Sequence, residues 1–321
     1  MTPQRIVAPA RGQIKLDSFD LPSVGPDQVL IETHYSAISP GTELAFLHNK
    51  PNTTGQYPFY PGYSACGQIV EKGDAVTALA VGQRVACRIP HASHFVVEAD
   101  RCLPLPDAIT EVEASVYRLV SIALQGVRKA QIQLGWEAAV VGLGPIGNLA
   151  GQLVRAAGAT HVEGIDPVGW RRELALHCGF DTVAASNEQS SRPAGFEAVI
   201  EATGVPEAVP AAFKLAKPLG QVVLLASTRG ETDGVNFYRD VHKKGLTVIG
   251  AHESIRPAVD DHLFYRSHRS DDETSLKLMA GSRIQIDPLV SDVVPAAEAA
   301  RAYERLAKRE EQLMLMVFKW R

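Results

Sequence analysis

Residues 137–147 form the pattern that most constrains this chain, because a short apolar run there leads directly into three spaced glycines. The glycines are Gly142, Gly144 and Gly147, in the spacing G-x-G-x-x-G, and a stretch with helical character follows at residues 148–157. In a strand–turn–helix unit the first glycine permits the tight turn, the second lets a pyrophosphate approach the backbone, and the third lets helix and strand pack closely. The free N–H groups at the start of the helix favour phosphate. We therefore expect a dinucleotide site here.

An acidic residue at the end of the next predicted strand indicates which dinucleotide is bound. The strand covers residues 161–165 and ends at Asp166, 24 residues after Gly142. An acidic residue near this distance can bind both ribose hydroxyls of NAD, and it repels the extra phosphate of NADP. Arg171 and Arg172 follow closely, and either could stack on adenine or pair with a 2′-phosphate. We expect NAD(H); the alternative is a βαβ unit that binds no nucleotide, with Asp166 as a surface residue.

The predicted strands and helices divide the chain into regions with different patterns. Residues 1 to about 120 are rich in short strands separated by Gly and Pro, and Thr110 is the expected N-cap of a helical stretch that runs to Ala130. From Trp136 strands and helices alternate, which favours a parallel, doubly wound sheet. After about residue 257 the pattern changes again, and this tail is expected to return to the first domain. The predicted strands are 28–33, 67–71, 83–87, 95–98, 138–141, 161–165, 198–201, 221–226, 247–249 and 313–318.

Composition limits the class of protein. A length of 321 residues suggests two domains, and 21% charged with 45% hydrophobic residues is ordinary for a soluble globular protein. The net charge of −4 indicates no attraction to nucleic acid or anionic membrane. No apolar run reaches the length of a membrane span, and the N-terminus lacks the apolar core of a signal peptide, so we expect a cytoplasmic location. The cysteines, Cys66, Cys87, Cys102 and Cys178, show no C-x-x-C spacing and are expected to be buried thiols.

A β-rich region, a Rossmann-like region and a return segment, in this order, resemble the medium-chain dehydrogenase/reductase superfamily in its branch similar to zinc-type alcohol dehydrogenases. Local strings match in order over nearly the whole chain: Ser39-Pro-Gly-Thr-Glu43, Pro61-Gly-Tyr-Ser64, Val81-Gly-Gln-Arg-Val85, Glu201-Ala-Thr-Gly-Val205 and Ile249-Gly-Ala251. The resemblance implies an α/β protein in which a Rossmann doubly wound parallel sheet is joined to a β-rich GroES-like catalytic domain. It places the GroES-like domain at residues 1–122, the Rossmann NAD-binding domain at 123–256 and the C-terminal return at 257–321.

The residues at the family's zinc positions depart from that resemblance. The position of the first cysteine ligand holds Ser39 or Pro40, the histidine and glutamate of the proline-glycine turn are Tyr63 and Ser64, and the third position falls near Arg118. None of these is a good Zn²⁺ ligand, and an arginine would repel the metal. The four-cysteine structural lobe also has no counterpart. We therefore expect a member that lacks both the catalytic and the structural zinc site.

Two histidines close to the missing lobe do not replace it. His91 and His94 are spaced i, i+3 in a segment that is expected to pass from a loop into a strand, and no third ligand is near them in the sequence. A metal site needs more ligands than this. A satisfied loop histidine is the default interpretation, and a substrate contact, for which we retain His94, is the second.

Without zinc, a side chain has to stabilise the oxygen from which hydride leaves or to which it adds. The resemblance places Tyr63 where a metal-ligating histidine would face the substrate, and a phenol can act there as acid and base; a packing aromatic in a tight turn is the alternative. Thr42 matches the hydroxyl that begins the family's proton relay, although the relay histidine is Ala45 here. The candidate catalytic residues are Tyr63, Thr42, Ser39 and His94, and Glu43 is expected to be structural.

The resemblance also completes the expected cofactor site. Glu201 and Thr203 lie in the stretch that lines the nicotinamide in the family, and capping of the strand end is their alternative role. The candidate cofactor-binding residues are Gly142, Gly144, Pro145, Ile146, Gly147, Asp166, Arg171, Thr203 and Ser227.

The function implied by the resemblance is a zinc-independent, NAD(H)-dependent oxidoreductase that interconverts a hydroxyl and a carbonyl on a polyol, a sugar-like compound or a secondary metabolite. Two alternatives stay open: an NAD(P)H-dependent reductase of conjugated C=C bonds, and a non-catalytic NAD-binding sensor or structural protein. The family implies a homodimer or homotetramer joined at the edges of the Rossmann sheets, and residues 234–238 precede the expected edge strand.

Overall fold

The computed structural model describes residues 2–261, 266–309 and 312–321. Its internal contacts divide the chain into two compact units. Unit 1 comprises Met1–Arg118, Leu276–Gly281 and Leu289–Arg321, and unit 2 comprises Leu119–Ser275 and Ser282–Pro288. The chain thus passes from unit 1 to unit 2 after Arg118. It returns to unit 1 at Leu276–Gly281, and again at Leu289 after the unit 2 segment Ser282–Pro288. The domain boundaries expected at residues 122 and 256 stay predictions.

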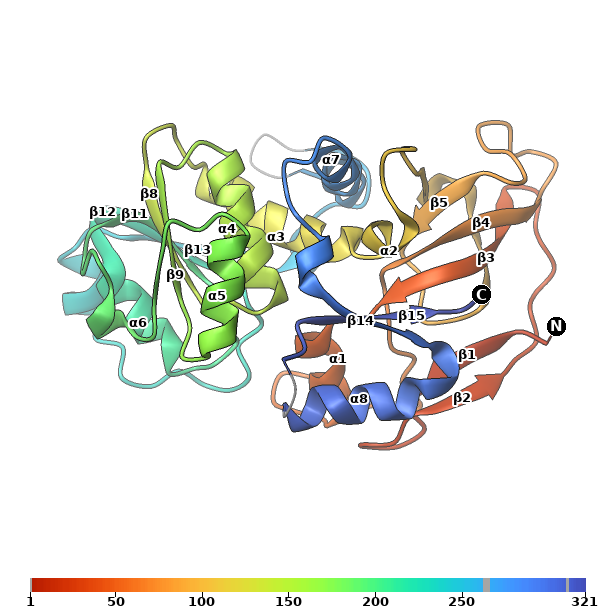
Figure 1. Ribbon diagram of the computed structural model, residues 1–321, viewed down its shortest axis with the longest axis horizontal. Coiled ribbons are helices and arrows are strands. Elements are labelled where there is room, and N and C mark those ends of the chain that lie inside the picture. The colour runs from red at the N-terminus through yellow and green to blue at the C-terminus, as the bar shows by residue number, and fades with distance from the viewer. Residues whose placement is uncertain (1, 262–265, 310–311) are drawn as a thin grey trace. The chain divides into compact units, whose positions relative to one another are not determined.

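Unit 2 is built on a six-stranded parallel sheet with the strand order β10-β9-β8-β11-β12-β13 (Figure 1). Its strands are β8 (Glu137–Val141), β9 (His161–Ile165), β10 (Thr182–Ala184), β11 (Phe196–Glu201), β12 (Ala216–Leu224) and β13 (Thr247–Gly250). The order runs outward in both directions from the β8–β11 pair, so right-handed crossovers place α4 (Pro145–Ala156) and α5 (Gly169–His177) on one face and α6 (Ala208–Leu215) on the other. The doubly wound sheet expected from the alternating pattern is confirmed.

The central strands of this sheet show continuous apolar runs because they are covered on both faces. Residues 138–140 of β8 and 198–200 of β11 are fully buried. A strand buried on both sides shows a continuous apolar run rather than alternation, which is how these strands were recognisable in the sequence.

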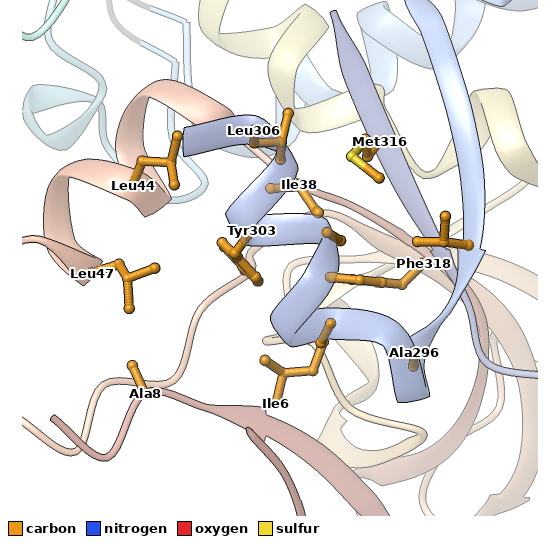
Figure 2. Close-up of a cluster of buried hydrophobic side chains, with 13 residues drawn as sticks. Ile6, Ala8, Ile38, Leu44, Leu47, Ala296, Tyr303, Leu306, Met316 and Phe318 are labelled. Atoms are coloured by element: carbon orange, nitrogen blue, oxygen red, sulfur yellow. The ribbon is translucent and has the colours of Figure 1, made fainter. Parts of the chain in front are cut away.

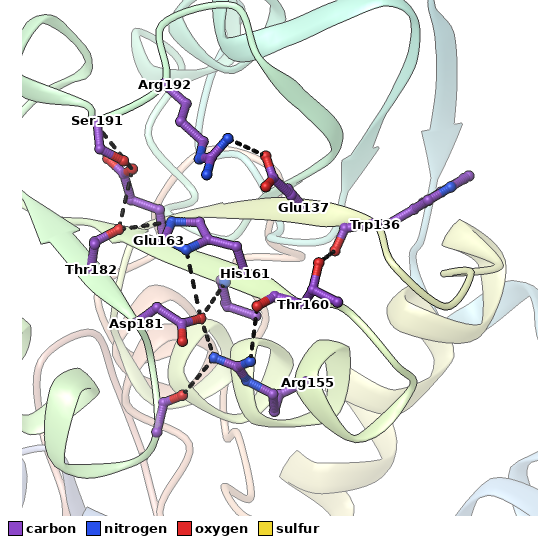
Figure 3. A network of polar contacts seen from close by, with 12 residues as sticks. Trp136, Glu137, Arg155, Thr160, His161, Glu163, Asp181, Thr182, Ser191 and Arg192 are labelled. Carbon is purple, nitrogen blue, oxygen red and sulfur yellow. Dashed lines mark hydrogen bonds and ion pairs between the residues drawn. The ribbon is translucent and has the colours of Figure 1, made fainter.

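A polar network in unit 2 includes side chains from β8 and β9 (Figure 3). Glu163 is fully buried and accepts hydrogen bonds from the main-chain N–H of Ser191 at 3.1 Å and from the Thr182 hydroxyl at 3.3 Å. Arg155 pairs with Asp181 in the same network. These contacts join β9 with β10 and with the segment that follows β10, while Arg155 links α4 to the residue before β10. The buried Glu163 carboxylate thus has its hydrogen-bond partners within the unit.

Unit 1 contains a seven-stranded, largely antiparallel sheet centred on the long strand β3 (Gln28–Ala37), which pairs with β4, β6 and β15. The other strands of this sheet are β4 (Ala65–Lys72), β5 (Arg84–Cys87), β6 (His94–Glu98), β7 (Cys102–Pro104), β14 (Val290–Pro295) and β15 (Leu315–Lys319). Strands β1 (Gln4–Val7) and β2 (Lys15–Ser18) form a separate antiparallel ribbon. The C-terminal tail therefore returns to the sheet of the N-terminal region through β15.

The remaining helices are α1 (Pro40–Leu47), α2 (Glu111–Ala114), α3 (Tyr117–Ala130), α7 (His268–Ala280) and α8 (Ala299–Lys308). Thr110 caps α2 as predicted, in a capping box with Glu113. Helix α1 was not predicted, because Pro40 and Gly41 open it and resemble a turn in the sequence. Among the described residues, no helix is long and apolar enough to cross a membrane.

The core of unit 1 joins its first and last segments (Figure 2). Leu44 and Leu47 of α1, Tyr303 and Leu306 of α8, and the fully buried Phe318 of β15 belong to one apolar cluster. Side chains separated by more than 250 residues in the sequence thus share this cluster. Full burial of a large apolar side chain of this kind stabilises the fold by about 1.5–3 kcal/mol for each such side chain.

The cysteines give a test of this packing. All four are buried and free. Burial raises the pKa of Cys178 to about 11, although a hydrogen bond with Asn148 lowers it in part, and burial also raises the pKa of Cys66 well above its ordinary range. We predict that a thiol-specific disulfide reagent at about pH 8 labels no cysteine of the native protein within minutes, and all of them after denaturation, since the thiolate is the reactive form. Rapid stoichiometric labelling of one native cysteine would contradict this.

Candidate cofactor and catalytic sites

The glycine turn of unit 2 lies where the strand order of the sheet reverses. Gly142 follows β8 with φ near +90°, and its N–H donates to the carbonyl oxygen of Ile165 at the end of β9. A Cβ atom on Gly142 would lie 2.7 Å from Cγ2 of Thr203, just after β11. The loops that follow β8 and β11 are therefore in contact, and ligands of open α/β sheets bind at such a reversal, outside the carboxyl ends of the strands.

The other two glycines of the turn have different surroundings. A Cβ atom on Gly147 would lie 1.8 Å from the carbonyl oxygen of Gly142, so the first turn of α4 packs directly on the loop. Gly144, the N-cap residue of α4, has no heavy atom within 4 Å of the corresponding position and makes no side-chain cap. Pro145 begins the helix, and the amides of Ile146 and Gly147 lie in its first turn, where N–H groups have no partner within the helix. Open space beside Gly144 and these amides fit a pyrophosphate.

Asp166 occupies the predicted strand end, and its carboxylate supports the glycine turn. The side chain is almost fully buried; Oδ2 accepts from the N–H of Leu143 and Oδ1 from the N–H of Val168, both at 2.8 Å. Nη1 of Arg171 lies 3.6 Å from Oδ2, and Arg172 donates to the main-chain oxygen of Asp166 at 2.7 Å. Negative charge at this position is thus held against the turn and balanced in part by Arg171.

Thr203 and Glu201 form a second support at the same edge of the sheet. Oε1 of Glu201 accepts hydrogen bonds from the N–H and the hydroxyl of Thr203, and the Thr203 hydroxyl oxygen accepts from the N–H of Val205. Burial raises the pKa of Glu201, and the bonds from Thr203 oppose this increase. Within the described residues Oε2 of Glu201 has no hydrogen-bond partner. The main-chain oxygen of Ser227, on the loop that follows β12, lies near Gly204.

In unit 1 the segment that carries Ser39 and Thr42 begins helix α1. Ser39 is the buried N-cap residue, but its hydroxyl makes no capping bond. Instead, Oε1 of Glu43 accepts the main-chain N–H of Ser39 at 2.7 Å. Thr42 is half-buried on the first turn. Both hydroxyls are therefore carried by a rigid helix start that the Glu43 carboxylate secures.

Glu43 is the centre of a buried hydrogen-bond network that the sequence did not indicate. Its other carboxylate oxygen lies 3.1 Å from Nε2 of His91 and accepts the hydroxyl of Tyr303. Nδ1 of His91 lies 2.8 Å from Oγ of Ser36, which also accepts the indole N–H of Trp320 at 2.9 Å. His91 is completely buried, and both of its ring nitrogens have partners. Hydrogen-bonded partners in this network lie up to 284 residues apart in the sequence, so no local signal could have grouped them.

The turn that carries Tyr63 packs on the same histidine. Gly62 has φ near +94°, and a Cβ atom there would lie 2.6 Å from Cγ of His91. The main-chain N–H of His91 donates to the carbonyl oxygen of Pro61 at 2.9 Å. Tyr63 follows this contact and is half-buried.

The other side of the turn is attached to the start of α3. The hydroxyl of Ser64 donates to the carbonyl oxygen of Ser115 and accepts the main-chain N–H of Arg118 at 3.3 Å. The side chain of Arg118 is completely buried. His94 has a separate position at the start of β6, opposite Glu32, with Nδ1 3.1 Å from the Ser93 hydroxyl. Burial lowers the pKa of His94, and nearby Glu32 opposes this decrease.

We predict that the side chains at the positions which the resemblance aligns with the family's zinc ligands do not hold zinc. Ser39 offers a hydroxyl and Tyr63 a phenol, while Arg118 contributes a permanent positive charge. Structural and catalytic Zn²⁺ sites use thiolate, imidazole and carboxylate ligands. In the part of the chain that the structure describes, no three His, Cys, Asp or Glu side chains are grouped so that they could hold a metal ion.

Comparisons with known proteins agree with this architecture. Residues 25–107 match the family model of the alcohol dehydrogenase GroES-like domain, and residues 145–259 match that of zinc-binding dehydrogenase. The chain is 27% identical to the D-guloside 3-dehydrogenase of Shigella flexneri over 256 residues, covering 76% of this chain and 73% of that protein. It is 24% identical to the sorbitol dehydrogenase of Gallus gallus over 354 aligned positions, covering 97% and 95%.

A solved structure shows the same fold. A protein of Sinorhizobium meliloti 1021, described as a zinc-binding dehydrogenase and bound to NADP, superposes with a TM-score of 0.84 at 23% identity and covers 100% of both chains. The GroES-like and Rossmann-like folds expected for the two parts of this chain are thereby confirmed.

Two glycine substitutions separate folding from cofactor binding in the turn. Gly144→Ala should leave the melting temperature nearly unchanged, because the position is open and its φ of −68° suits alanine. The added methyl group should nevertheless weaken NADH binding about 10-fold or more, which corresponds to about 1.4 kcal/mol. Gly147→Ala should lower the melting temperature strongly, because its Cβ meets the Gly142 oxygen. Calorimetry of both variants measures the two effects; unchanged NADH affinity in Gly144→Ala would contradict the assignment.

Proposed function

We propose that this chain is an NAD(H)-dependent oxidoreductase that interconverts a hydroxyl and a carbonyl on a polyol or sugar-like substrate without zinc. The chain belongs to the medium-chain dehydrogenase/reductase superfamily, in the zinc-type alcohol dehydrogenase-like branch. The observation that carries this proposal is the open glycine turn at the reversal of the parallel sheet, combined with hydroxyl side chains where the family has metal ligands. Both parts of the chain needed for such an enzyme match their family models.

The substrate class rests on the relatives. One is a D-guloside 3-dehydrogenase and another a sorbitol dehydrogenase, so both act on compounds with several hydroxyl groups. The hydroxyls of Ser39 and Thr42 suit an oxygen-centred reaction, since a hydroxyl can both donate to and accept from a substrate oxygen. An alkoxide or carbonyl oxygen is therefore the expected reacting group.

The proposed cofactor is NAD(H), held by residues of unit 2. Open space at Gly144 and the amides of Ile146 and Gly147 suit its pyrophosphate, and the Asp166 carboxylate suits the adenine ribose. Arg171 is placed to contact the adenine end beside Asp166. When bound, the nicotinamide ring supplies the hydride donor or acceptor. Thr203 and Ser227, on loops that follow β11 and β12, complete the proposed binding surface.

Tyr63 is the proposed acid and base. In the reducing direction its O–H donates a proton to the carbonyl oxygen as that oxygen becomes a hydroxyl, and in the oxidising direction the phenolate takes the proton back. Thr42 and Ser39 donate hydrogen bonds to the same oxygen as it gains negative charge. His94 is proposed to contact the substrate. These roles replace the stabilisation of the alkoxide that a metal supplies elsewhere in the family.

We further propose a homo-oligomer joined at the edges of unit 2. Strand β13 is the last strand of its sheet, and Phe237 and Tyr238 shortly before it are exposed. A sheet edge with exposed aromatic residues is suited to pairing with a second copy.

Cofactor preference is the first test of the proposed function. We expect NADH to bind at least about 10-fold more tightly than NADPH, because the Asp166 carboxylate repels a 2′-phosphate, and oxidation of polyols such as sorbitol to proceed with NAD. Arg171→Ala should keep the preference for NADH. Tighter binding of NADPH together with reduction of conjugated enones would support a C=C reductase, and cofactor binding without turnover across alcohols, ketones and enones would support a sensor.

Removal of one phenolic oxygen tests the acid–base role. Tyr63→Phe should lower kcat about 100-fold or more, since a positioned general acid contributes about 10²–10⁴, while the affinity for NADH stays the same. Tyr60→Phe is the matched control, because Tyr60 lies three residues earlier, is exposed, and contacts the guanidinium of Arg5 through its ring rather than its oxygen. A kcat for Tyr63→Phe close to that of the control would contradict the role of Tyr63.

A further inference from the structure

We propose that His91 is a positioning residue that holds the two segments carrying the candidate catalytic hydroxyls, Ser39–Thr42 and Pro61–Tyr63, in fixed places. This inference rests on the proposed function for its consequence in catalysis, whereas the contacts that it invokes belong to unit 1 alone. His91 links the two segments: its ring is hydrogen-bonded to Glu43, whose carboxylate accepts the main-chain N–H of Ser39, and its main chain and ring meet the turn before Tyr63.

The partners of the network determine where its hydrogen atoms lie. The Glu43 carboxylate only accepts, so Nε2 of His91 carries a proton and donates it to Glu43. In the neutral imidazole Nδ1 is then an acceptor and receives the single hydroxyl proton of Ser36, whose oxygen accepts the indole N–H of Trp320. Burial and the adjacent Glu43 carboxylate raise the pKa of Tyr303 well above its ordinary value, so its hydroxyl also stays a donor to Glu43. Every hydrogen bond in this network thus has a defined direction.

The first segment is held through the Glu43 carboxylate. This side chain is 1% exposed and accepts three hydrogen bonds, from the main chain of Ser39, from His91 and from Tyr303. Because the carboxylate caps the helix start, the hydroxyl of Ser39 is not used as a cap and is available for another partner. The His91 donor fixes one oxygen of Glu43 and thereby aims the other at the Ser39 amide.

The second segment is held by the main chain and the ring of His91. Its N–H donates to the carbonyl oxygen of Pro61, and its own carbonyl oxygen accepts the N–H of Ile6 at 2.9 Å. The ring lies so close to Gly62 that no larger residue fits there. Phe318 contacts the other side of the ring edge-on, with centroids 5.0 Å apart. The imidazole is therefore confined between the core and the turn that presents Tyr63.

The experiment compares His91→Leu, which keeps an apolar side chain but removes both ring nitrogens, with His91→Gln, whose amide can accept from Ser36 and donate to Glu43. His34→Gln is the matched control: His34 is also partly buried in unit 1 and hydrogen-bonded to a carboxylate, that of Glu111, but does not touch either segment through that bond. Each variant is assayed for sorbitol oxidation with NAD and for main-chain hydrogen exchange, and the wild-type His91 tautomer is read from its ¹⁵N resonances.

We expect His91→Leu to lower kcat about 10- to 100-fold, as displacement of a reacting group by about 1 Å can do, with little change in the affinity for NADH, and His91→Gln to recover most of this loss. Exchange should accelerate at residues 38–42 in His91→Leu alone, and the wild-type ring should be protonated on Nε2. The proposal would be overturned by equal kcat in all variants, by equal exchange at residues 38–42, or by a proton on Nδ1. Faster exchange throughout unit 1 in both His91 variants would also overturn it, because that result indicates a purely structural role.

Failure of the proposed function is distinguishable from failure of this inference. If the wild-type protein oxidises neither sorbitol nor other polyols, the proposed function fails. The exchange and tautomer measurements need no turnover, and they still decide whether His91 holds the two segments.

Discussion

A close approach of another chain segment to a glycine, with no space for a Cβ atom, shapes each of the two candidate sites. In unit 2 the first turn of α4 rests on the carbonyl oxygen of Gly142, and only a glycine at position 147 allows this. In unit 1 the ring of His91 occupies the space that a Cβ on Gly62 would need. Both contacts involve neighbouring chain segments that have to lie against each other before a ligand can be held. The geometry of the sites is thus determined by backbone packing first, and by side-chain chemistry second.

The strand–turn–helix unit at residues 137–156 was predicted well because its signals are local. The strand, the three glycines and the helix lie within about 20 consecutive residues, and Asp166 ends the next strand as expected. What the sequence could not predict was how Asp166 is used. Its carboxylate accepts hydrogen bonds from Leu143 and Val168, and the spacing of an acidic residue contains no information on such main-chain contacts.

Unit 1 was harder to predict because the residues that contact one another there are distant in the sequence. Helix α1 looked like a turn, since proline and glycine open it, and its helix start is capped by Glu43 rather than by the preceding serine. The partners of Glu43 come from residues 91 and 303, and the neighbour of His91, Ser36, is bonded to Trp320 at the end of the chain. Such a network appears only when the fold brings the segments together. The roles given to Tyr63, Thr42, Ser39 and His94 stay predictions.

We propose that hydride transfer here depends on hydroxyl and phenol groups held by a buried network, because the side chains that the family resemblance aligns with metal ligands are poor ligands for zinc. Metal analysis combined with activity tests this most directly. After exhaustive dialysis against a strong chelator, the protein is expected to contain only traces of transition metal and to oxidise its polyol substrate with NAD at an unchanged rate. Zinc retained in a one-to-one ratio before chelation, with activity lost on its removal and restored on its return, would contradict the account.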